Sequence, residues 1–493
     1  MIRSFTRLLL FLIAASAFAA DAPTPLREFL YAMPKGGDLH NHLSGAVYAE
    51  SYLALARHDA MCIDTPKLTI VPCTTPVPDG VVPVEKAFSD SSLYSAMLDA
   101  MSMRQFRPIS QSGHDHFFAT FGKFRNVTRK HVGEMLTEVV ERFAEENVDY
   151  VETTFAPDLG AAASVIAPLV SGTTFDAMYA SVMANPENLK KLDSVVADAR
   201  RTIDDAEATM RGSLRCGERF ARPGCDSTVR YIDELYRGTP SKSFFAGLLV
   251  GYRLASVDPR VVAVNPVMPE DGYLSMSQFD EQMRMFAYFR PRYPRVHLTT
   301  HAGELTLGLV PIEGLRHHIR DSVLVAGAER IGHGVDIAYE RDSSELMKTM
   351  AARGIAVEIC LTSNDVILGV RGHEHPLRLY LAHGVPVALA TDDPGVSRDD
   401  MTNQYVRAAQ EQNLTYDQLK QIARNSLEYS FVEGVSLFTN HDYEQVASPC
   451  EHEDSTQCSS FLGANTKARL QHRLEQSFRD FEAKYGHSLP RST

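Results

Sequence analysis

The chain has 493 residues and carries 49 Lys and Arg against 62 Asp and Glu, a formal net charge of −13. Hydrophobic residues make up 44% and charged residues 23%, which is ordinary for a globular protein and excludes a collagenous or wholly disordered chain. An acidic chain is a poor partner for nucleic acid. The charge therefore predicts no nucleic-acid binding and favours a neutral or cationic small-molecule substrate.

The first twenty residues have the pattern of a secretory signal peptide. Arg3 and Arg7 precede an apolar run over 8–15, and residues 17–19 read Ala-Phe-Ala, a cleavage pattern. The run is too short to span a bilayer. We therefore predict that residues 1–20 are removed and that the mature chain is exported, to the periplasm or the extracellular space, without a membrane segment. An uncleaved anchor is the alternative.

Six of the seven cysteines form pairs that are close in sequence. The pairs are Cys62 with Cys73, Cys216 with Cys225, and Cys450 with Cys458. Each lies in a polar, loop-like stretch, so we predict three local disulfides, as in exported proteins, although six cysteines allow 15 pairings. Cys360 lies in an apolar run and is predicted to be a buried free thiol. Free thiols throughout, in a cytosolic protein, are the alternative.

Short apolar runs alternate with helical patterns along the chain. The candidate strands are Gly37–His42, Val148–Phe155, Phe244–Tyr252, Val261–Val267, Val296–His301, Arg330–His333, Ile355–Leu361 and Val385–Thr391. Helical patterns at Val132–Asn147, Met276–Phe289 and Ser343–Arg353 lie between them. This alternation predicts an α/β fold, a (β/α)8 TIM barrel. Periodicity alone also allows an open, doubly wound sheet.

Two stretches exceed what a minimal barrel needs. We interpret residues 48–109 and 161–241 as insertions in a barrel domain over residues 21–434. Residues 435–493 are interpreted as a C-terminal extension that ends in an amphipathic helix over Ala464–Tyr485. The expected organisation is thus a signal peptide, one metal-dependent barrel and a helical extension.

The first candidate metal ligands end the first strand. His40 and His42 are two residues apart, so on a strand both side chains point to one face, which is the interior of a barrel. Two imidazoles pack poorly in a core unless a divalent metal binds them. As an isolated pattern His-x-His is a weak signal. His114-Asp115-His116 has the same spacing in a predicted loop and is interpreted as a non-ligand.

Further polar residues end the fifth and sixth strands. His301 offers a third nitrogen ligand. Gly303 allows a sharp turn that brings Glu304 over the site, where a carboxyl near a metal is placed to transfer protons. His333 lies between two glycines, which leave room for a ligand beside it.

Two adjacent carboxylates end the eighth strand. Asp392 and Asp393 repel each other unless a cation binds one of them. A metal on Asp392 leaves Asp393 free to bind substrate. No Lys lies in the fourth strand, Val261–Val267, which argues against a carbamylated-lysine site with two metals and for a single metal. All these candidates lie at carboxyl ends of strands, where barrel enzymes have their active sites.

Together these motifs resemble the amidohydrolase superfamily and, more closely, the adenosine deaminase family. The matching stretches are Met33-Pro34-Lys35 with His40-Asn41-His42, His301-Ala302-Gly303-Glu304, Gly332-His333-Gly334, Cys360–Asn364 with His375-Pro376, and Thr391–Gly395. The resemblance runs from about Met33 to Glu433, with gaps at the insertions. The signal peptide, the cysteines and the insertions resemble the secreted adenosine deaminase growth-factor branch.

The resemblance implies a reaction and a role for each candidate. The implied ligands of one zinc ion per chain are His40, His42, His301 and Asp392. Glu304 is implied to protonate the purine N1, His333 to orient or deprotonate the zinc-bound water, and Asp393 to hydrogen-bond N7. The implied reaction is hydrolytic deamination of adenosine or 2′-deoxyadenosine to inosine and ammonia.

Two positions depart from the family pattern. Ser44 stands where the family has an Asp that contacts the ribose, and Met268 stands where it has a Gly near the purine N3, so Met268 would crowd the purine unless the loop shifts. With Gly303 and Asp393 they are the expected substrate-binding positions. The departures leave open another 6-aminopurine nucleoside or a nucleotide as substrate, or a non-catalytic adenosine-binding signalling protein. A nucleotide would need Lys or Arg near the pocket, and the sequence shows no such cluster.

The oligomeric state is open. The resembling growth-factor deaminases dimerise partly through an N-terminal segment, whereas the segment before the barrel here, Asp21–Tyr31, is short. A homodimer is therefore retained as one of two alternatives.

Overall fold

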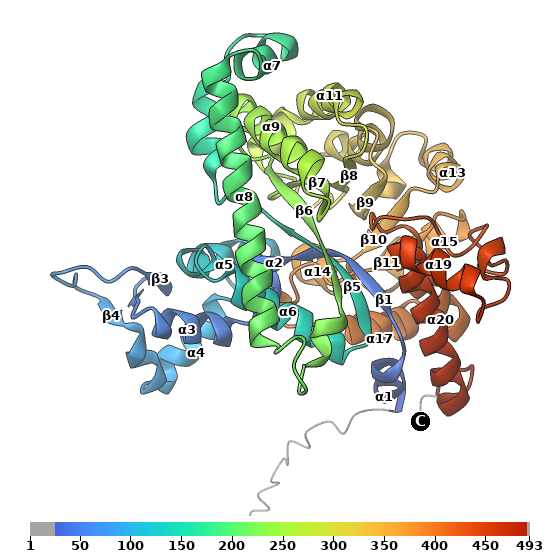
Figure 1. The fold of residues 1–493 in the computed structure, drawn as a ribbon. Coiled ribbons are helices and arrows are strands. Elements are labelled where there is room, and N and C mark those ends of the chain that lie inside the picture. Colours follow the sequence, from blue (N-terminus) through green and yellow to red (C-terminus); the bar gives the residue numbers. More distant parts are fainter. Residues whose placement is uncertain (1–24, 491–493) are drawn as a thin grey trace, which may run out of the picture.

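The computed structural model describes residues 25–490, and its centre is an eight-stranded parallel sheet (Figure 1). The strands are β1 Gly36–His42, β5 Val148–Phe155, β6 Thr228–Tyr236, β7 Val261–Val267, β8 His297–Ala302, β9 Arg330–His333, β10 Ala356–Ile359 and β11 Val387–Leu389. The predicted signal peptide, residues 1–20, lies outside the described residues.

The sheet closes on itself. The strands are neighbours in chain order from β1 to β11, and a parallel bridge between Asn41 and Asp392 joins the last strand to the first. The His42 N–H donates to the Asp392 carbonyl at 2.9 Å, and the Asp392 N–H donates to the His40 carbonyl at 2.8 Å. The predicted (β/α)8 barrel is confirmed, and the open sheet is excluded.

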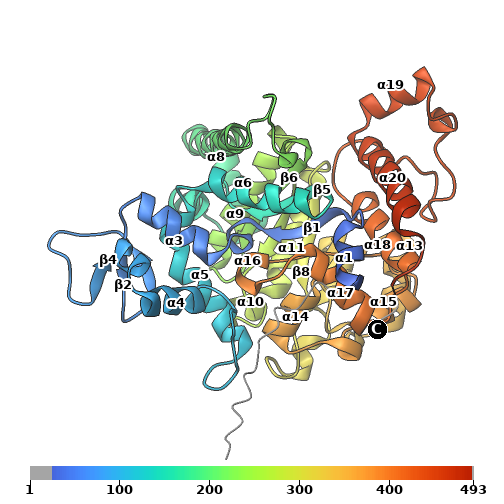
Figure 2. The same ribbon diagram turned by 90° about the horizontal axis from the view of Figure 1, so that it is seen from below.

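Helices surround the barrel, as the view from below shows (Figure 2). The main ones are α6 Val132–Glu145, α9 Ser241–Val257, α11 Phe279–Phe289, α13 Ser343–Arg353, α14 Leu361–Leu368, α15 Leu377–Ala382, α17 Met401–Glu411 and α18 Tyr416–Glu428. In α6 the buried residues recur at helical spacing and face the strands, while the glutamates face outward. The barrel strands are thus covered on both faces, which explains their continuous apolar runs.

The third barrel strand is not where the apolar pattern predicted it. Phe244–Tyr252 lies inside α9, and the third strand is β6, Thr228–Tyr236. A run that is apolar on every side fits a buried helix as well as a buried strand, and α9 is buried along most of its length. Charged side chains interrupt the pattern of β6. Because β6 lies within 161–241, the range expected as an insertion, the inserted part ends at Ser227.

The first insertion leads away from the barrel and returns over it. After α3, Ala49–His58, it forms a small sheet of β2 Cys62–Asp64, β3 Thr69–Val71 and β4 Val81–Pro83, which projects from the barrel (Figure 1). The helices α4 Ser91–Ala100 and α5 Gly113–Thr128 follow. His114 and His116 lie in the first turn of α5, so the loop predicted there is wrong. A disulfide joins Cys62 to Cys73.

The second insertion adds a helical layer outside the barrel. It contains α7 Phe175–Met183 and the long α8 Pro186–Ser213, which lies against α6 and α9 (Figures 1 and 2). A disulfide joins Cys216 to Cys225 just after α8.

The two ends of the described chain lie side by side. Phe29 in α1, Pro25–Ala32, packs edge-on against Phe481 of α20, Thr466–Tyr485, with ring centroids 4.9 Å apart. A disulfide between Cys450 and Cys458 closes the loop before α19, Thr456–Ala464, onto that helix. All three predicted disulfides are therefore present, and Cys360 is free and buried as predicted. Within residues 25–490 no helix combines the length and the apolar character needed to cross a membrane.

Candidate metal centre and substrate cavity

Four side chains converge at the carboxyl ends of three strands. His40 and His42 end β1, His301 lies near the end of β8 and Asp392 follows β11; their candidate ligand atoms all lie within 4.8 Å of one another. The His301 Nε2 is 3.1 Å from the Nε2 atoms of both His40 and His42. Asp392 Oδ1 lies 3.4 Å from His40 Nε2 and 3.3 Å from His42 Nε2. The structure thus brings the four predicted metal ligands together.

The opposite nitrogen of each imidazole faces an oxygen acceptor. The partners are Glu358 for His40 (2.6 Å), Glu234 for His42 (3.4 Å) and Asn265 for His301 (3.0 Å). Each Nδ1 therefore carries the proton, which leaves the Nε2 atoms bare. Bare nitrogens 3.1 Å apart repel unless a cation lies between them. Tetrahedral Zn²⁺ with ligands at about 2.0–2.1 Å would separate them by about 3.3 Å, so this donor set fits one divalent metal of that kind.

Glu358 fixes the orientation of His40. Arg330 Nε donates to it at 2.6 Å and the Thr299 hydroxyl at 2.9 Å, all in the buried interior. Burial alone would raise the pKa of Glu358. The charge of Arg330 and the hydrogen bond from His40 outweigh burial and lower this pKa to about 2. An ionised partner makes the imidazole a better metal ligand. Sequence analysis missed Glu358, whose signal was a single charge inside the apolar run 355–361.

Glu304 lies in the turn that follows β8. Gly303 has a φ of +74°, and a Cβ there would lie 2.5 Å from Asp336 Oδ1. The N–H groups of Gly303 and Glu304 donate to the two carboxylate oxygens of Glu270, at 3.2 and 2.8 Å. Burial, followed by the charges of Asp392 and Glu270, raises the pKa of Glu304 well above its usual range. A raised pKa favours the protonated carboxyl, which can donate its proton.

A chain of hydrogen bonds sets the tautomer of His333. The Leu377 N–H can only donate, so His375 Nδ1 accepts at 3.2 Å and its Nε2–H donates to Asn364 Oδ1 at 3.0 Å. The Asn364 amide then donates to His333 Nδ1 at 3.0 Å. This leaves the proton of His333 on Nε2, which lies 4.0 Å from Asp392 Oδ2. Burial lowers the pKa of His333 to about 3, so the ring is a neutral donor.

Asp393 lies beside the metal ligands and lines the cavity above them. Gly45 is packed so closely against its carboxyl that a Cβ there would overlap it. Burial, together with the charge of Asp392, raises the pKa of Asp393 well above its usual range. Its buried Oδ1 has no hydrogen-bond partner among residues 25–490. The raised pKa favours the neutral carboxyl, which in this position can donate to a ring nitrogen of a ligand.

A cavity of about 790 Å³ opens above the metal group. Asp393, Ser44 and Met268 line it as predicted for substrate-binding positions, whereas Gly303 is not among its lining residues. Helix α5 supplies an aromatic wall, made of Phe117, Phe118, Phe121 and Phe124. The size and the mixture of apolar walls with a few polar groups are those of a small-molecule site.

The cavity also contains charged residues that sequence analysis did not assign. Arg125 in α5 and Arg129 just after it line the cavity, so cationic side chains do lie near the pocket although the sequence showed no cluster. Asp158, Asp233 and Glu234 line it from the ends of β5 and β6. The sequence did not predict helix α5, which contains Arg125 and ends just before Arg129. It also did not predict strand β6, which contains Asp233 and Glu234.

Met268 keeps the backbone conformation of a glycine. Its φ is +86°, in the left-handed region. Its side chain lies over Gly238, where an added Cβ would be 2.9 Å from the methionine methyl carbon. The loop after β7 therefore accommodates Met268 by placing its side chain on the surface of a glycine, and the side chain remains 41% exposed.

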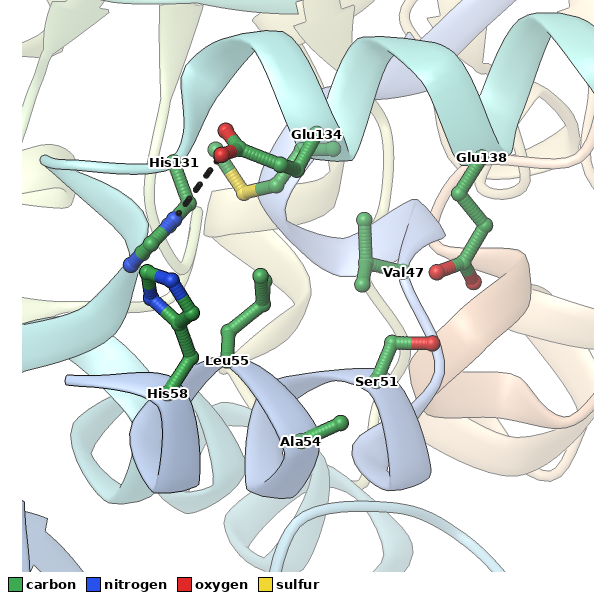
Figure 3. A pocket seen from close by; sticks show the side chains of 9 residues that line it. Val47, Ser51, Ala54, Leu55, His58, His131, Glu134 and Glu138 are labelled. Carbon is green, nitrogen blue, oxygen red and sulfur yellow. Dashed lines mark ion pairs between the residues drawn. The ribbon is translucent and has the colours of Figure 1, made fainter. Parts of the chain in front are cut away.

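A second pocket, of about 400 Å³, lies between α3 and α6 (Figure 3). His58, His131 and Glu134 line it, with His131 Nδ1 3.3 Å from Glu134 Oε1. No group of candidate metal ligands in the described part of the chain includes these side chains. Met135 borders both pockets, but the convergent chemistry belongs to the cavity above the metal group.

Comparison with known proteins agrees with this geometry. A family model described as adenosine deaminase matches residues 92–436. The adenosine deaminase of Escherichia coli is 39% identical over 137 residues, which are 28% of this chain and 38% of that enzyme. The alignment thus spans well under half of the length of the relatives it matches.

Two solved structures share the fold over most of their length. One is an amidohydrolase from Burkholderia ambifaria with bound Zn, with a TM-score of 0.53, 17% identity and coverage of 95% of this chain and 98% of that chain. The other is Arabidopsis ADAL complexed with IMP, with a TM-score of 0.55, 18% identity and coverage of 92% and 99%. At this identity the likeness supports the barrel fold.

Proposed function

Because this chain belongs to the adenosine deaminase family of the amidohydrolase superfamily, we propose that it is a zinc-dependent enzyme that hydrolyses adenosine, or 2′-deoxyadenosine, to inosine and ammonia. The observation that carries the proposal is the convergence of three bare imidazole nitrogens and Asp392 beneath a cavity that Glu304, an acid with a raised pKa, also lines. A metal without an acid would suit many hydrolases, whereas the acid supplies what a weakly electrophilic purine ring requires.

His40, His42, His301 and Asp392 would hold one Zn²⁺ per chain. A zinc ion at such ligands lowers the pKa of a coordinated water from 15.7 to about 7 and so supplies hydroxide at neutral pH. Glu358, Glu234 and Asn265 fix the three imidazoles with their Nε2 atoms toward that position. The remaining steps belong to side chains of the cavity.

The residues around the purine ring move or hold protons. Glu304 delivers its proton to N1, which makes C6 electrophilic as the oxygen adds there. The His333 Nε2–H donates a hydrogen bond to the attacking oxygen and orients it. Asp393, whose raised pKa favours the neutral carboxyl, donates to N7. The added oxygen gives its proton to the amino group, the bond from C6 to that nitrogen breaks, and ammonia leaves as the oxygen becomes the carbonyl of inosine. The proton that the water loses before it adds restores Glu304.

A second candidate is a 6-aminopurine nucleotide deaminase. The observation that favours it is the pair Arg125 and Arg129, whose guanidinium groups line the cavity and suit phosphate recognition. ADAL, whose structure contains IMP, shows that this fold accepts a purine nucleotide in that protein. The two candidates share the metal and Glu304 and differ only at the outer part of the cavity.

We also propose that the protein works outside the cytoplasm. Three disulfides within one chain suit an oxidising compartment. Residues 1–20 would be the signal peptide, residues 21–434 the catalytic barrel with its insertions, and residues 435–493 an extension. Mass spectrometry of the protein secreted by its host would show a mature N-terminus just after Ala19 or Ala20.

Metal analysis and an ammonia assay test the proposal directly. Purified protein should contain about one zinc per chain and release ammonia from adenosine as the absorbance of inosine develops. A chelator should abolish turnover, and added Zn²⁺ should restore it. Full activity of the metal-free protein would refute a metal-dependent reaction. Metal-loaded protein without activity on any aminopurine nucleoside or nucleotide would refute the deaminase.

A further inference from the structure

The proposed contacts fix the direction in which the sugar leaves the purine. N1 faces Glu304 after β8 and N7 faces Asp393 after β11, so the ring edge that carries C6 spans the ends of β8 to β11. N9 lies across the ring system from C6. In the closed eight-stranded order, β5 and β6 lie opposite β9 and β10. A substituent on N9 therefore points toward the ends of β5 and β6.

Glu234 lies on β6 at this side of the cavity. One carboxylate oxygen is 3.4 Å from His42 Nδ1, and the other accepts the Tyr236 hydroxyl at 3.0 Å. The side chain is 14% exposed, and no Lys or Arg within residues 25–490 pairs with it. A largely buried carboxylate with so few donors has unused lone pairs, which can accept further hydrogen bonds from a ligand.

The surrounding wall is acidic. Asp158 lines the same side of the cavity as Glu234. Asp233, the preceding residue on β6, points the other way, toward Gly251 of α9. Ser44 also lines the cavity and has no charge. Hydroxyl groups can donate to such a wall, whereas a phosphate of charge near −2 is repelled by it.

We propose that Glu234 is a specificity-determining residue that accepts a hydrogen bond from a sugar hydroxyl of the substrate and, with Asp158, selects neutral nucleosides over nucleoside 5′-phosphates. This inference rests on the proposed deaminase function, because it uses the purine orientation that the reaction requires. It decides between the two candidate functions. Arg125 on α5 and Arg129 just after it are exposed, and the Arg129 guanidinium lies near Gly160, in the loop that carries Asp158.

Substrate analogues that lack one hydroxyl test the proposal. The substrates are adenosine, its 2′-, 3′- and 5′-deoxy forms, and AMP. Each is measured as kcat/KM on the zinc-loaded wild-type enzyme, on Glu234→Gln and on the control Glu313→Gln, an exposed residue that does not line the cavity. We expect wild-type kcat/KM for AMP to be at least about 100-fold below that for adenosine. A hydrogen bond to a charged group corresponds to about 10–100-fold in affinity, so Glu234→Gln should lose about that much with adenosine.

The comparison of kcat/KM among the analogues shows whether Glu234 binds a sugar hydroxyl. For the analogue that lacks the contacted hydroxyl, wild type and Glu234→Gln should have nearly equal kcat/KM, because the bond is already absent. An equal loss with all analogues, together with reduced zinc content, would show that Glu234 acts only through His42 and would overturn the proposal. AMP turned over as well as adenosine would also overturn it, and would assign phosphate binding to Arg125 and Arg129.

Failure of the proposed function has a different signature. If zinc-loaded wild type deaminates neither adenosine nor AMP, the deaminase assignment itself fails. If it deaminates adenosine and only the pattern over the analogues is absent, the assignment stands and the role of Glu234 is wrong. Calorimetric titration of Glu304→Gln with adenosine and AMP compares the two ligands without turnover and should show the same preference for adenosine.

Discussion

The metal centre and the sugar side of the same cavity are built in different ways. The metal ligands lie at the ends of β1, β8 and β11, where backbone hydrogen bonds between His42 and Asp392 close the barrel and fix their positions. The sugar side combines β6 with helix α5, which follows the first insertion. The difference leads us to propose that the barrel fixes the reaction, whereas substrate choice depends also on α5, which contributes no candidate metal ligand.

Removal of a metal ligand should have the largest effect. We expect His42→Ala to lower bound zinc from about one per chain to near zero and to bring deamination below detection, since one of four ligands is lost. Circular dichroism should show an intact barrel. His373→Ala, which alters an exposed histidine outside the cavity, is the control. Retention of both zinc and activity by His42→Ala would place the metal elsewhere and remove the basis of the comparison.

Loss of the acid should leave the metal in place. Glu304→Gln has nearly the same shape, and because burial and the neighbouring carboxylates favour the neutral form of Glu304, the substitution should cost little stability. General acid–base groups contribute about 10²–10⁴-fold, so kcat should fall at least about 10²-fold with zinc content and thermal unfolding unchanged. Normal turnover would show that Glu304 has no catalytic role. Loss of zinc would show that Glu304 is a metal ligand.

The tautomer of His333 gives an intermediate effect. In Asn364→Asp the side chain can only accept, so it favours a proton on His333 Nδ1 and removes it from the Nε2 that faces the site. We expect kcat to fall about 10–100-fold with zinc retained. Ring-nitrogen NMR signals of His333 should report the altered tautomer. Asn188→Asp, on the outer helix α8, is the control, and an unchanged kcat would show that the donor on Nε2 is not needed.

How much of this was predictable depends on where each residue lies. His40, His42, His301 and Asp392 were identified from sequence because barrel strands end in register, and residues at strand ends therefore meet. Asn265 and Glu358, which orient two of the ligands, were not identified, because their role depends on which strands are neighbours in the closed barrel.

The sugar side was less predictable for a different reason. Glu234 lies on the strand that was misassigned, because charges interrupt the apolar pattern of β6 while the apolar α9 imitates a strand. Arg125 and Arg129 reach the cavity only because α5 returns over the barrel from the insertion. Such long-range placement leaves no local signal in the sequence.

The smallest expected effect concerns Met268 and Gly238, and it tests whether the substrate wall varies independently of the metal. Gly238→Ala adds a Cβ 2.9 Å from the end of the flexible Met268 side chain, which must then move into the cavity. We expect kcat/KM for adenosine to fall a few-fold, mostly through KM, with zinc content unchanged.

Met268→Gly removes both the displaced side chain and the strain of a φ of +86°. That strain is worth about 1 kcal/mol or more, and its removal offsets the lost apolar contact. Its stability should therefore stay close to that of the wild type. The double variant should recover the kcat/KM of Met268→Gly alone, because the clash no longer exists, and this non-additivity is the diagnostic result. If Gly238→Ala lowers kcat/KM equally in the presence and absence of Met268, the two residues do not interact. The contact with Gly238 then does not determine the conformation of the loop after β7.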